Sequence, residues 1–328
     1  MKKGLLIILI ILSLFGCGNK EAQRVEREKF LFGTYIKVIV YDTDVKLAEK
    51  SIDAAFAEIA RVDEKLNSKH KGSIIDQINN SENKKIKIDE ETKYILDEVE
   101  RVYNLSDKGF DITISPLMDA WGFSEGGNER VPSSEEIKEA LSKVDYSKVD
   151  TEGGYLTYNS PVKEIDTGAF LKGYAISKAK LLMEDMGITS AFITSISSIE
   201  TIGTKPDGKK WRIGIQDPAD PREIMEIVNL DDRAMGVSGD YQTFVEIDGA
   251  KYHHILSSKT GYPIREKKMV VVLCEDGYTG DLYSTAFFSM DTEEVIKYVE
   301  SKDELDVLIV EENSEIVTSD GFSTFINK

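Results

Sequence analysis

The sequence contains few cysteines and prolines, and each scarcity limits what the chain can be. Its two cysteines allow at most one disulfide within the 328 residues. Its seven prolines form no Pro-rich linker, and no internal repeat or low-complexity tract marks a domain boundary. Neither G-x-G-x-x-G nor G-x-x-x-x-G-K-[ST] occurs, so both of these nucleotide-binding fingerprints are excluded.

Positive charge is outnumbered by negative charge. The chain has 59 acidic residues and 41 Lys and Arg, which gives a formal net charge of −18. Such a surface repels nucleic acid and anionic lipid headgroups, so no nucleic-acid partner is expected. It also repels a ligand that bears phosphate, unless a metal ion or a local lysine offsets the field.

The longest apolar run lies at the N-terminus. "MKKGLLIILIILSLFGCGNK" begins with Lys2 and Lys3 and continues with an apolar run over 5–15, which is too short to span a bilayer and typical of a signal peptide. Residues 14–17 resemble a lipobox. This predicts cleavage before Cys17, a lipid on Cys17 and an anchor on the extracytoplasmic face of the cell membrane. The alternative is an ordinary signal peptide in which Cys17 occurs by chance.

These features predict how the chain is divided. We expect a lipoprotein signal peptide over 1–16, a polar, lipid-anchored tether over 17–28 and a domain over 29–328. If Cys17 is lipidated, Cys274 has no partner for a disulfide. Cys274 ends the apolar run "VVVLC", so we interpret it as a core residue and not as a nucleophile.

Hydrophobic periodicity predicts a mixture of strands and helices. Ser133 and Glu136 have the spacing of a capping box, and hairpins are predicted about Pro206-Asp207-Gly208 and Asp248-Gly249. The mixture favours an α+β fold with mixed, largely antiparallel sheets and packed helices over a doubly wound parallel sheet. The other expected elements are helices over 45–66, 91–106, 133–144, 167–187 and 281–290, strands over 35–42, 162–166, 191–196 and 269–275, a loop over 109–123 and a closing hairpin over 305–322.

Two of the three histidines are adjacent, in "KYHHILSSKTGYP" over 251–263. Side chains alternate along a strand, so His253 and His254 are expected to face opposite ways. Histidine is the commonest general base near neutral pH, and an apolar pair and a tight turn follow His254. We predict His254 as a site residue and His253 as its neighbour facing solvent. The alternative is that His254 is structural.

Asp281 and Thr285 stand four residues apart on a predicted helix and therefore share one face. Their oxygen atoms suit a hard cation such as Mg²⁺, which is usually held by few carboxylates together with substrate phosphates. The alternative is that Asp281 is only the N-cap of the helix.

Two further stretches combine residues that bind ligands. In "EIDTGAFLKGYA" (164–175), a helix N-terminus follows Asp166 and favours an anion, and Lys172 could meet a phosphate. The alternative is a solvated lysine. In "GFDIT" (109–113), Phe110 and Asp111 could line a pocket for a flat ring system. The alternative is that Phe110 belongs to the core and Asp111 forms a turn.

The order of these fragments is more specific than any one of them. "GFDITISPLMDAWGF", "IDTGAFLKGYA", "GTKPDGKKWRIGIQDP", "SGDYQ", "HHILSSKTGYP" and "GDLYSTA" follow one another along the chain. In this order they resemble the FAD:protein FMN transferase family, the ApbE-like lipoproteins. The resemblance runs from about Phe32 to the helix that contains Asp281, and the lipobox fits the same family.

The resemblance implies an ApbE-like fold and a Mg²⁺-dependent reaction. FAD is split at its pyrophosphate, FMN is attached through a phosphoester bond to a threonine of a partner protein, and AMP leaves. The implied partners are flavin-accepting subunits of membrane electron-transfer complexes. Some relatives hydrolyse FAD to FMN and AMP instead.

Matched position by position, the resemblance implies a role for several residues. His254 corresponds to the histidine proposed to deprotonate the acceptor threonine. The metal would be held by Asp281, Thr285 and the backbone carbonyl of Ala169. The residues that would meet FAD are Phe32, Gly109, Phe110, Asp111, Asp166, Lys172 and Ile264.

Three stretches depart from the family pattern. Ile196-Ser197-Ser198 stands where the family has a Gly-Gly pair, Ser257-Ser258 replaces Asp-Pro, and Gly280-Asp-Leu-Tyr-Ser-Thr replaces Ala-Asp-Ala-x-x-Thr. The predicted metal pair and the histidine are kept, whereas the backbone around the flavin pocket is open to change. The alternatives are an FAD pyrophosphatase, a lipid-anchored flavin-binding protein without turnover and a generic solute-binding lipoprotein.

Overall fold

The centre of the fold is an eight-stranded sheet. The computed structural model describes residues 21–80, 85–124, 127, 130–160 and 164–326. Every pair of neighbouring strands in this sheet is antiparallel. In spatial order the strands are β1 (Gln23–Leu31), β2 (Thr34–Asp42), β6 (Ala191–Ser195), β7 (Ser198–Ile202), β10 (Ala234–Gly239), β13 (Lys267–Cys274), β14 (Asp306–Glu311) and β15 (Ile316–Thr318).

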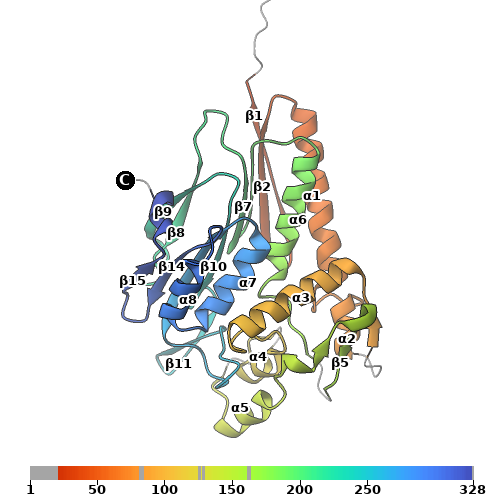
Figure 1. Ribbon diagram of the computed structural model, residues 1–328, viewed down its shortest axis with the longest axis vertical. Helices are drawn as coiled ribbons and strands as arrows, with labels where there is room; N and C mark the ends of the chain where they lie inside the picture. Colours follow the sequence, from red (N-terminus) through yellow and green to blue (C-terminus); the bar gives the residue numbers. More distant parts are fainter. Residues whose placement is uncertain (1–20, 81–84, 125–126, 128–129, 161–163, 327–328) are drawn as a thin grey trace, which may run out of the picture.

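Helices cover one face of this sheet, and two of them lie side by side along its length (Figure 1). Strand alternation explains the contact, because Ile36, Val38 and Val40 of β2 are fully buried and belong to the main core with the helices. The helices on this face are α1 (Val45–Leu66), α6 (Leu171–Asp185) and α7 (Gly277–Phe288), and α3 (Glu90–Leu105) crosses near their ends.

The bounds of α1 follow directly from its sequence. The side chain of Asp44 accepts hydrogen bonds from the backbone N–H groups of Lys46 and Leu47 at 3.0 Å and 3.2 Å, which caps the first turn. Apolar residues then recur at helical spacing and are buried in the main core. The helix predicted over 45–66 is therefore confirmed.

The opposite face of the sheet is covered by a hairpin of β8 (Trp211–Gln216) and β9 (Ile224–Leu230). Trp211, Ile213 and Ile215 are buried and alternate with exposed residues along β8. They form a second core with buried residues of the sheet. The large sheet is thus enclosed between helices and a small sheet, which confirms the α+β prediction.

Smaller elements complete the fold, several of them at the lower end of the molecule in Figure 1. α4 (Ser115–Trp121) and α5 (Ser134–Leu141) pack together, and the Ser133–Glu136 capping box is confirmed. The hairpin about Asp248-Gly249 is confirmed as well, with β11 and β12 as its strands. The remaining elements are α2 (Ile74–Asn80), α8 (Thr292–Val299), β3 (Lys85–Lys87), β4 (Val149–Asp150), β5 (Tyr155–Tyr158), β11 (Phe244–Ile247), β12 (Ala250–His253) and three short 3₁₀ turns, Tyr146–Lys148, Glu152–Gly154 and Gly321–Phe325.

Three local predictions are wrong. The 109–123 segment is not all loop, because it contains the short helix α4. Pro116 is tolerated in the first turn of this helix, and Gly122, at φ +78°, ends it. Residues 164–166 form no strand, and 161–163 lie outside the described residues. The two strands about Pro206-Asp207-Gly208 belong to different sheets, because β8 pairs with β9.

The N-terminal predictions fall largely outside the described residues. The signal peptide over 1–16 and Cys17 lie there, so the structure does not address them. The segment predicted as a tether overlaps β1, since Gln23 to Glu28 pair with β2. In the part of the chain that the structure covers, no helix is long and apolar enough to cross a bilayer. Cys274 is fully buried in the main core, as predicted.

Candidate functional site

The predicted site residues meet in one cavity of about 450 Å³. Its wall is built from segments far apart in the sequence: the β1–β2 turn, the loop after α3, the start of α6, the β6–β7 turn, β10, the segment after β12 and α7. All the predicted FAD, metal and catalytic residues line it: Phe32, Gly109, Phe110, Asp111, Asp166, Ala169, Lys172, His254, Ile264, Asp281 and Thr285.

Asp281 is placed by a close crossing of α6 and α7. A Cβ atom on Gly173 would lie 2.1 Å from the Gly277 carbonyl oxygen and 2.8 Å from Asp281 Cγ, so only glycine permits this approach. The Gly173 N–H donates to Asp281 Oδ2 at 2.8 Å. Ser198 Oγ lies 2.7 Å from Oδ1 and 2.9 Å from Oδ2 and donates its single proton to this carboxylate. The N-cap of α7 is Asp276, so the capping alternative for Asp281 is wrong.

The surroundings of Asp281 suit a hard cation. Burial raises the pKa of the Asp281 carboxyl to about 6, although the charge of Lys172 acts in the opposite direction. Thr285 follows one turn later, with its Oγ1 3.1 Å from Ser238 Oγ. The carboxylate, this hydroxyl and the backbone of Ala169 offer oxygen ligands from one cavity wall.

The number of ionisable ligands limits such a cation site. Across the described residues, no group of three or more His, Cys, Asp and Glu could hold a metal ion. A cation beside Asp281 would therefore depend on one carboxylate, neutral oxygens and oxygens of a ligand. This donor set fits Mg²⁺, which is usually held by one or two carboxylates and substrate phosphates.

His254 lies on the cavity wall in a fixed tautomer. Its Nδ1–H donates to the Thr243 carbonyl at 3.1 Å, and its backbone N–H donates to the same oxygen at 3.1 Å. The ring therefore keeps Nε2 as its proton acceptor. Burial lowers the pKa of His254, and the charge of Lys172 adds to this effect, so the ring is neutral near pH 7.

His253 is buried, which contradicts the prediction that it faces solvent. The side chain is 2% exposed, and its Nε2–H donates to the Ile264 carbonyl at 2.6 Å. The Ile255 N–H donates to Nδ1 at 3.3 Å, and Phe288 packs against the ring. Burial lowers the pKa of His253 to about 4. The two histidines do face different surroundings, as predicted. His254 borders the cavity, whereas His253 faces a packed interior.

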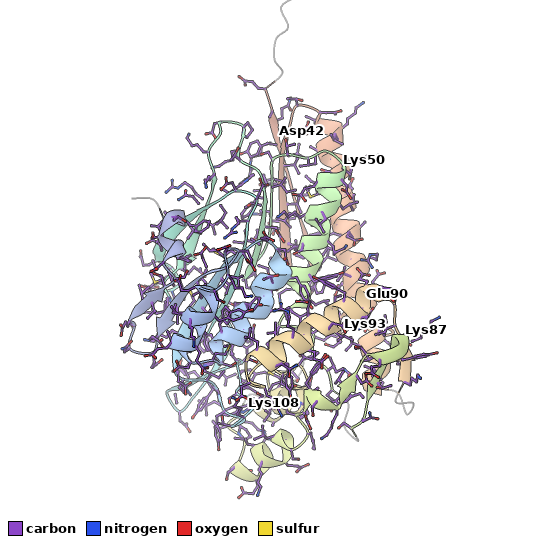
Figure 2. All side chains as sticks on the ribbon, in the orientation of Figure 1. Asp42, Lys50, Lys87, Glu90, Lys93 and Lys108 are labelled. Carbon is purple, nitrogen blue, oxygen red and sulfur yellow. The ribbon has the colours of Figure 1, made fainter. Side chains whose placement is uncertain are left out.

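The loop between α3 and α4 contributes a rigid part of the wall. It follows Lys108, labelled in Figure 2 at the lower end of the molecule. The Asp111 carboxylate accepts from Thr113 N at 2.8 Å, Thr113 Oγ1 at 2.6 Å and Tyr146 N at 3.0 Å. Phe110 is 3% exposed and belongs to the main core. Asp111 therefore holds a turn and Phe110 belongs to the core, as the alternative interpretation proposed. Both residues also border the cavity.

Asp166 and Lys172 lie on either side of the turn that leads into α6. The Gly168 N–H donates to Asp166 Oδ1 at 2.5 Å, and Lys172 Nζ donates to the Gly168 carbonyl at 3.1 Å. Lys172 is half-buried at the cavity wall. Its ammonium group is therefore held near the cavity, in contrast to a lysine that extends into solvent.

Comparison with known proteins decides the family. The model of the ApbE family matches residues 32–309. This chain belongs to the ApbE family. The crystal structure of the ApbE protein from Thermotoga maritima is similar over 93% of this chain and 100% of that one, with a TM-score of 0.84 and 31% identity.

A second solved ApbE structure and two curated relatives support the same family assignment. The flavin transferase ApbE from Vibrio cholerae gives a TM-score of 0.82 at 25% identity, over 93% of this chain and 100% of that one. A curated FAD:protein FMN transferase of Vibrio cholerae is 28% identical over 99% of this chain and 97% of its own length. Another, from Haemophilus influenzae, is 26% identical over 99% of this chain and 96% of its own length.

One departure from the ApbE pattern is compensated locally. Ser257 replaces the usual Asp, and its Oγ accepts from the N–H groups of Lys259 and Thr260, each at 3.2 Å. Serine thus makes the side-chain to backbone bonds by which Asp commonly holds a turn. The Gly261 N–H closes the turn on the Ser257 carbonyl at 2.7 Å. The segment between His254 and Ile264 therefore keeps a tight turn.

Several wall residues of this ApbE chain were not predicted as site residues. Val237, Ser238, Gly239 and Gln242, in and beside the quoted stretch "SGDYQ", all line the cavity. Lys69, an exposed residue in the loop after α1, also lines the cavity, but no local pattern marks it. Ser198 lies behind the wall and contacts Asp281, which no spacing rule in the sequence reveals.

Proposed function

We propose that this chain is a Mg²⁺-dependent FAD:protein FMN transferase. It cleaves FAD, attaches FMN through a phosphoester bond to a threonine of a partner protein and releases AMP. The observation that carries the proposal is the shared cavity of Asp281, Thr285 and neutral His254. The curated relatives that match nearly the whole chain are named FAD:protein FMN transferase, which supports transfer of FMN from FAD to a protein.

The cavity offers complementary surfaces for the two ends of FAD. Phe32, Phe110 and Ile264 supply apolar wall for the flavin, while Lys172 and Lys69 supply positive charge for phosphate oxygens. Asp281, Thr285 and the carbonyl of Ala169 would hold Mg²⁺. When bound, this ion neutralises charge on the phosphates and stabilises the negative charge that develops during phosphoryl transfer.

His254 is assigned as the general base. Its Nδ1–H is engaged by the Thr243 carbonyl, so Nε2 carries the lone pair that takes the proton of the acceptor hydroxyl. The lowered pKa of His254 keeps this lone pair available near neutral pH. Removal of that proton makes the hydroxyl oxygen a better nucleophile toward the FMN phosphorus, and AMP leaves from the same phosphorus.

The acceptor and the location follow from the same proposal. The acceptor is a flavin-accepting subunit of a membrane electron-transfer complex. A lipid on Cys17, after removal of 1–16, would hold the enzyme on the extracytoplasmic face of the cell membrane. The apolar run, its flanking lysines and the lipobox-like residues support this location.

Substitution of Asp281 tests the metal site. Asp281→Ala removes the only carboxylate of the proposed ligand set, so metal-dependent release of AMP from FAD is expected to fall at least 100-fold, on the scale of electrostatic contributions to transfer steps. AMP, FMN and FAD are separated by chromatography, with an acceptor protein present and with EDTA as a blank.

Asp276→Ala is the matched control. Asp276 is the N-cap of the same helix and does not line the cavity. Loss of this cap costs about 1 kcal/mol of stability, but metal-dependent turnover is expected to remain. Full activity of Asp281→Ala would contradict the proposed metal site.

A further inference from the structure

Ser198 is the residue of the β6–β7 hairpin that touches the proposed metal ligand. It begins β7, is fully buried, and its Oγ lies 2.7 Å from Asp281 Oδ1 and 2.9 Å from Oδ2. A serine hydroxyl carries one proton. It can therefore bond either carboxylate oxygen without the side chain moving.

The backbone of Ser198 is held from both sides. Ser198 pairs with Ser195 of β6 and with Gly236 of β10 in the large sheet. Its Cα atom is therefore fixed in the sheet, whereas Asp281 projects from α7. The contact joins the sheet to the helix beneath the cavity wall.

The carboxylate of Asp281 keeps acceptor capacity after these contacts. Within the described residues its donors are Ser198 Oγ and the Gly173 N–H, which lies 2.8 Å from Oδ2. An ionised carboxylate has about four lone-pair sites. Two donors fix the plane of the group and leave room on it for a cation.

We propose that Ser198 is a positioning residue, whose hydroxyl orients the Asp281 carboxylate for Mg²⁺. This inference rests on the proposed metal site. Ser198 does not line the cavity, so it acts through Asp281 and not on the substrate. Groups that orient a metal ligand through a hydrogen bond typically change metal affinity 10- to 100-fold when removed.

The chain offers a matched control in Ser195. Ser195 pairs with Ser198 across the β6–β7 hairpin, next to its turn, and is equally buried. Its Oγ has no hydrogen-bond partner in the part of the chain that the structure describes. Ser195→Ala therefore removes a hydroxyl of the same kind from the same place without touching Asp281.

The test is the affinity of the purified, full chain for Mn²⁺, a Mg²⁺ substitute visible in electron paramagnetic resonance. It is measured with a fixed, saturating concentration of FAD, because the proposed site has one carboxylate of its own and also needs oxygens of a ligand. Ser198→Ala is expected to bind Mn²⁺ about 10- to 100-fold more weakly than the unaltered chain, and Ser195→Ala to bind it equally well. Thermal unfolding of the three proteins without metal shows that each is folded at the temperature of the titration.

The outcomes separate this inference from the proposed function. If Ser198→Ala loses stability but keeps its Mn²⁺ affinity, the hydroxyl is structural and the inference is overturned while the metal site stands. If the unaltered chain with FAD binds no Mn²⁺ beyond that bound by FAD alone, the metal site and the inference fall together. Weaker binding in Ser195→Ala as well would also overturn the inference, because the effect would not depend on contact with Asp281.

Discussion

At the residue scale, the site depends on two groups whose charge states are set by their surroundings. Asp281 is buried beside donors from α6 and β7, and its carboxylate borders a cavity that suits a cation. His254 is held neutral, with its proton on Nδ1 toward the Thr243 carbonyl. An acceptor hydroxyl and a metal-bound phosphate would thus meet a base and a cation in one cavity.

Replacement of His254 tests the base. His254→Ala is expected to slow transfer of FMN by about 10² or more, in line with general-base contributions, while FAD affinity changes little. The rate is measured in single turnover and the affinity by flavin fluorescence. His70→Ala, at an exposed histidine outside the cavity, is the control and should be fully active.

The dependence of the transfer rate on pH shows which protonation state of His254 is active. The folded-state pKa of His254 lies below the ordinary 6.5 because of burial. The active, neutral form is therefore present above that pKa, and transfer is expected to fall as pH drops through it. His254→Ala should lack this acid limb. A variant with the wild-type rate and profile would exclude His254 as the base.

The sequence predicted these residues better than it predicted their surroundings. The spacing of Asp281 and Thr285 places both on one helix face, which the structure bears out. Strand alternation separated His253 from His254. It did not reveal that His253 is covered, because Phe288 and the Ile264 carbonyl come from other segments of the chain. Burial of this kind depends on tertiary packing.

At the element scale, the β6–β7 turn is the most unusual part of the site. Ile196 has φ +39° and is 74% exposed, although it borders the cavity. A two-residue hairpin turn with positive φ at its first position favours glycine, and a β-branched residue there is strained. An exposed, strained apolar side chain at a cavity wall is consistent with a contact to ligand.

Ile196→Gly should therefore separate stability from binding. Relief of the strained φ is expected to raise the free energy of unfolding by about 1 kcal/mol, measured by urea denaturation, while loss of the apolar contact weakens FAD binding several-fold. Asp248→Gly, in the β11–β12 turn at φ +52°, is the control and should gain less, since Asp tolerates this conformation. A less stable Ile196→Gly protein would contradict the strain argument.

Elements with strong local signals were predictable, and elements that depend on partners were not. α1 has both a cap and a continuous apolar face, so its bounds could be read directly. β8 carries an equally clear alternation, but it pairs with β9, which follows it in the chain, and not with the strand that precedes the predicted turn at Pro206-Asp207-Gly208. The strand β1 is polar enough to resemble a tether, and only its pairing with β2 makes it part of the sheet.

At the scale of the whole molecule, charge and fold together favour a metal-dependent reaction. The chain carries a net charge of −18, and its cavity wall includes Asp111, Asp166 and Asp281 beside Lys69 and Lys172. Carboxylates outnumber ammonium groups there, so a diphosphate would be repelled without a cation. The cavity wall combines residues of the large sheet, the helices and the loops between them, from Phe32 to Ser289.

The most direct test of the central claim is a mass spectrum of an acceptor protein. The purified enzyme is incubated with FAD, Mg²⁺ and a protein domain that carries the acceptor threonine, with EDTA in a parallel sample. The account predicts a metal-dependent mass gain equal to FMN less one water, together with AMP. An unmodified acceptor, with FAD either intact or split to free FMN and AMP, would contradict it.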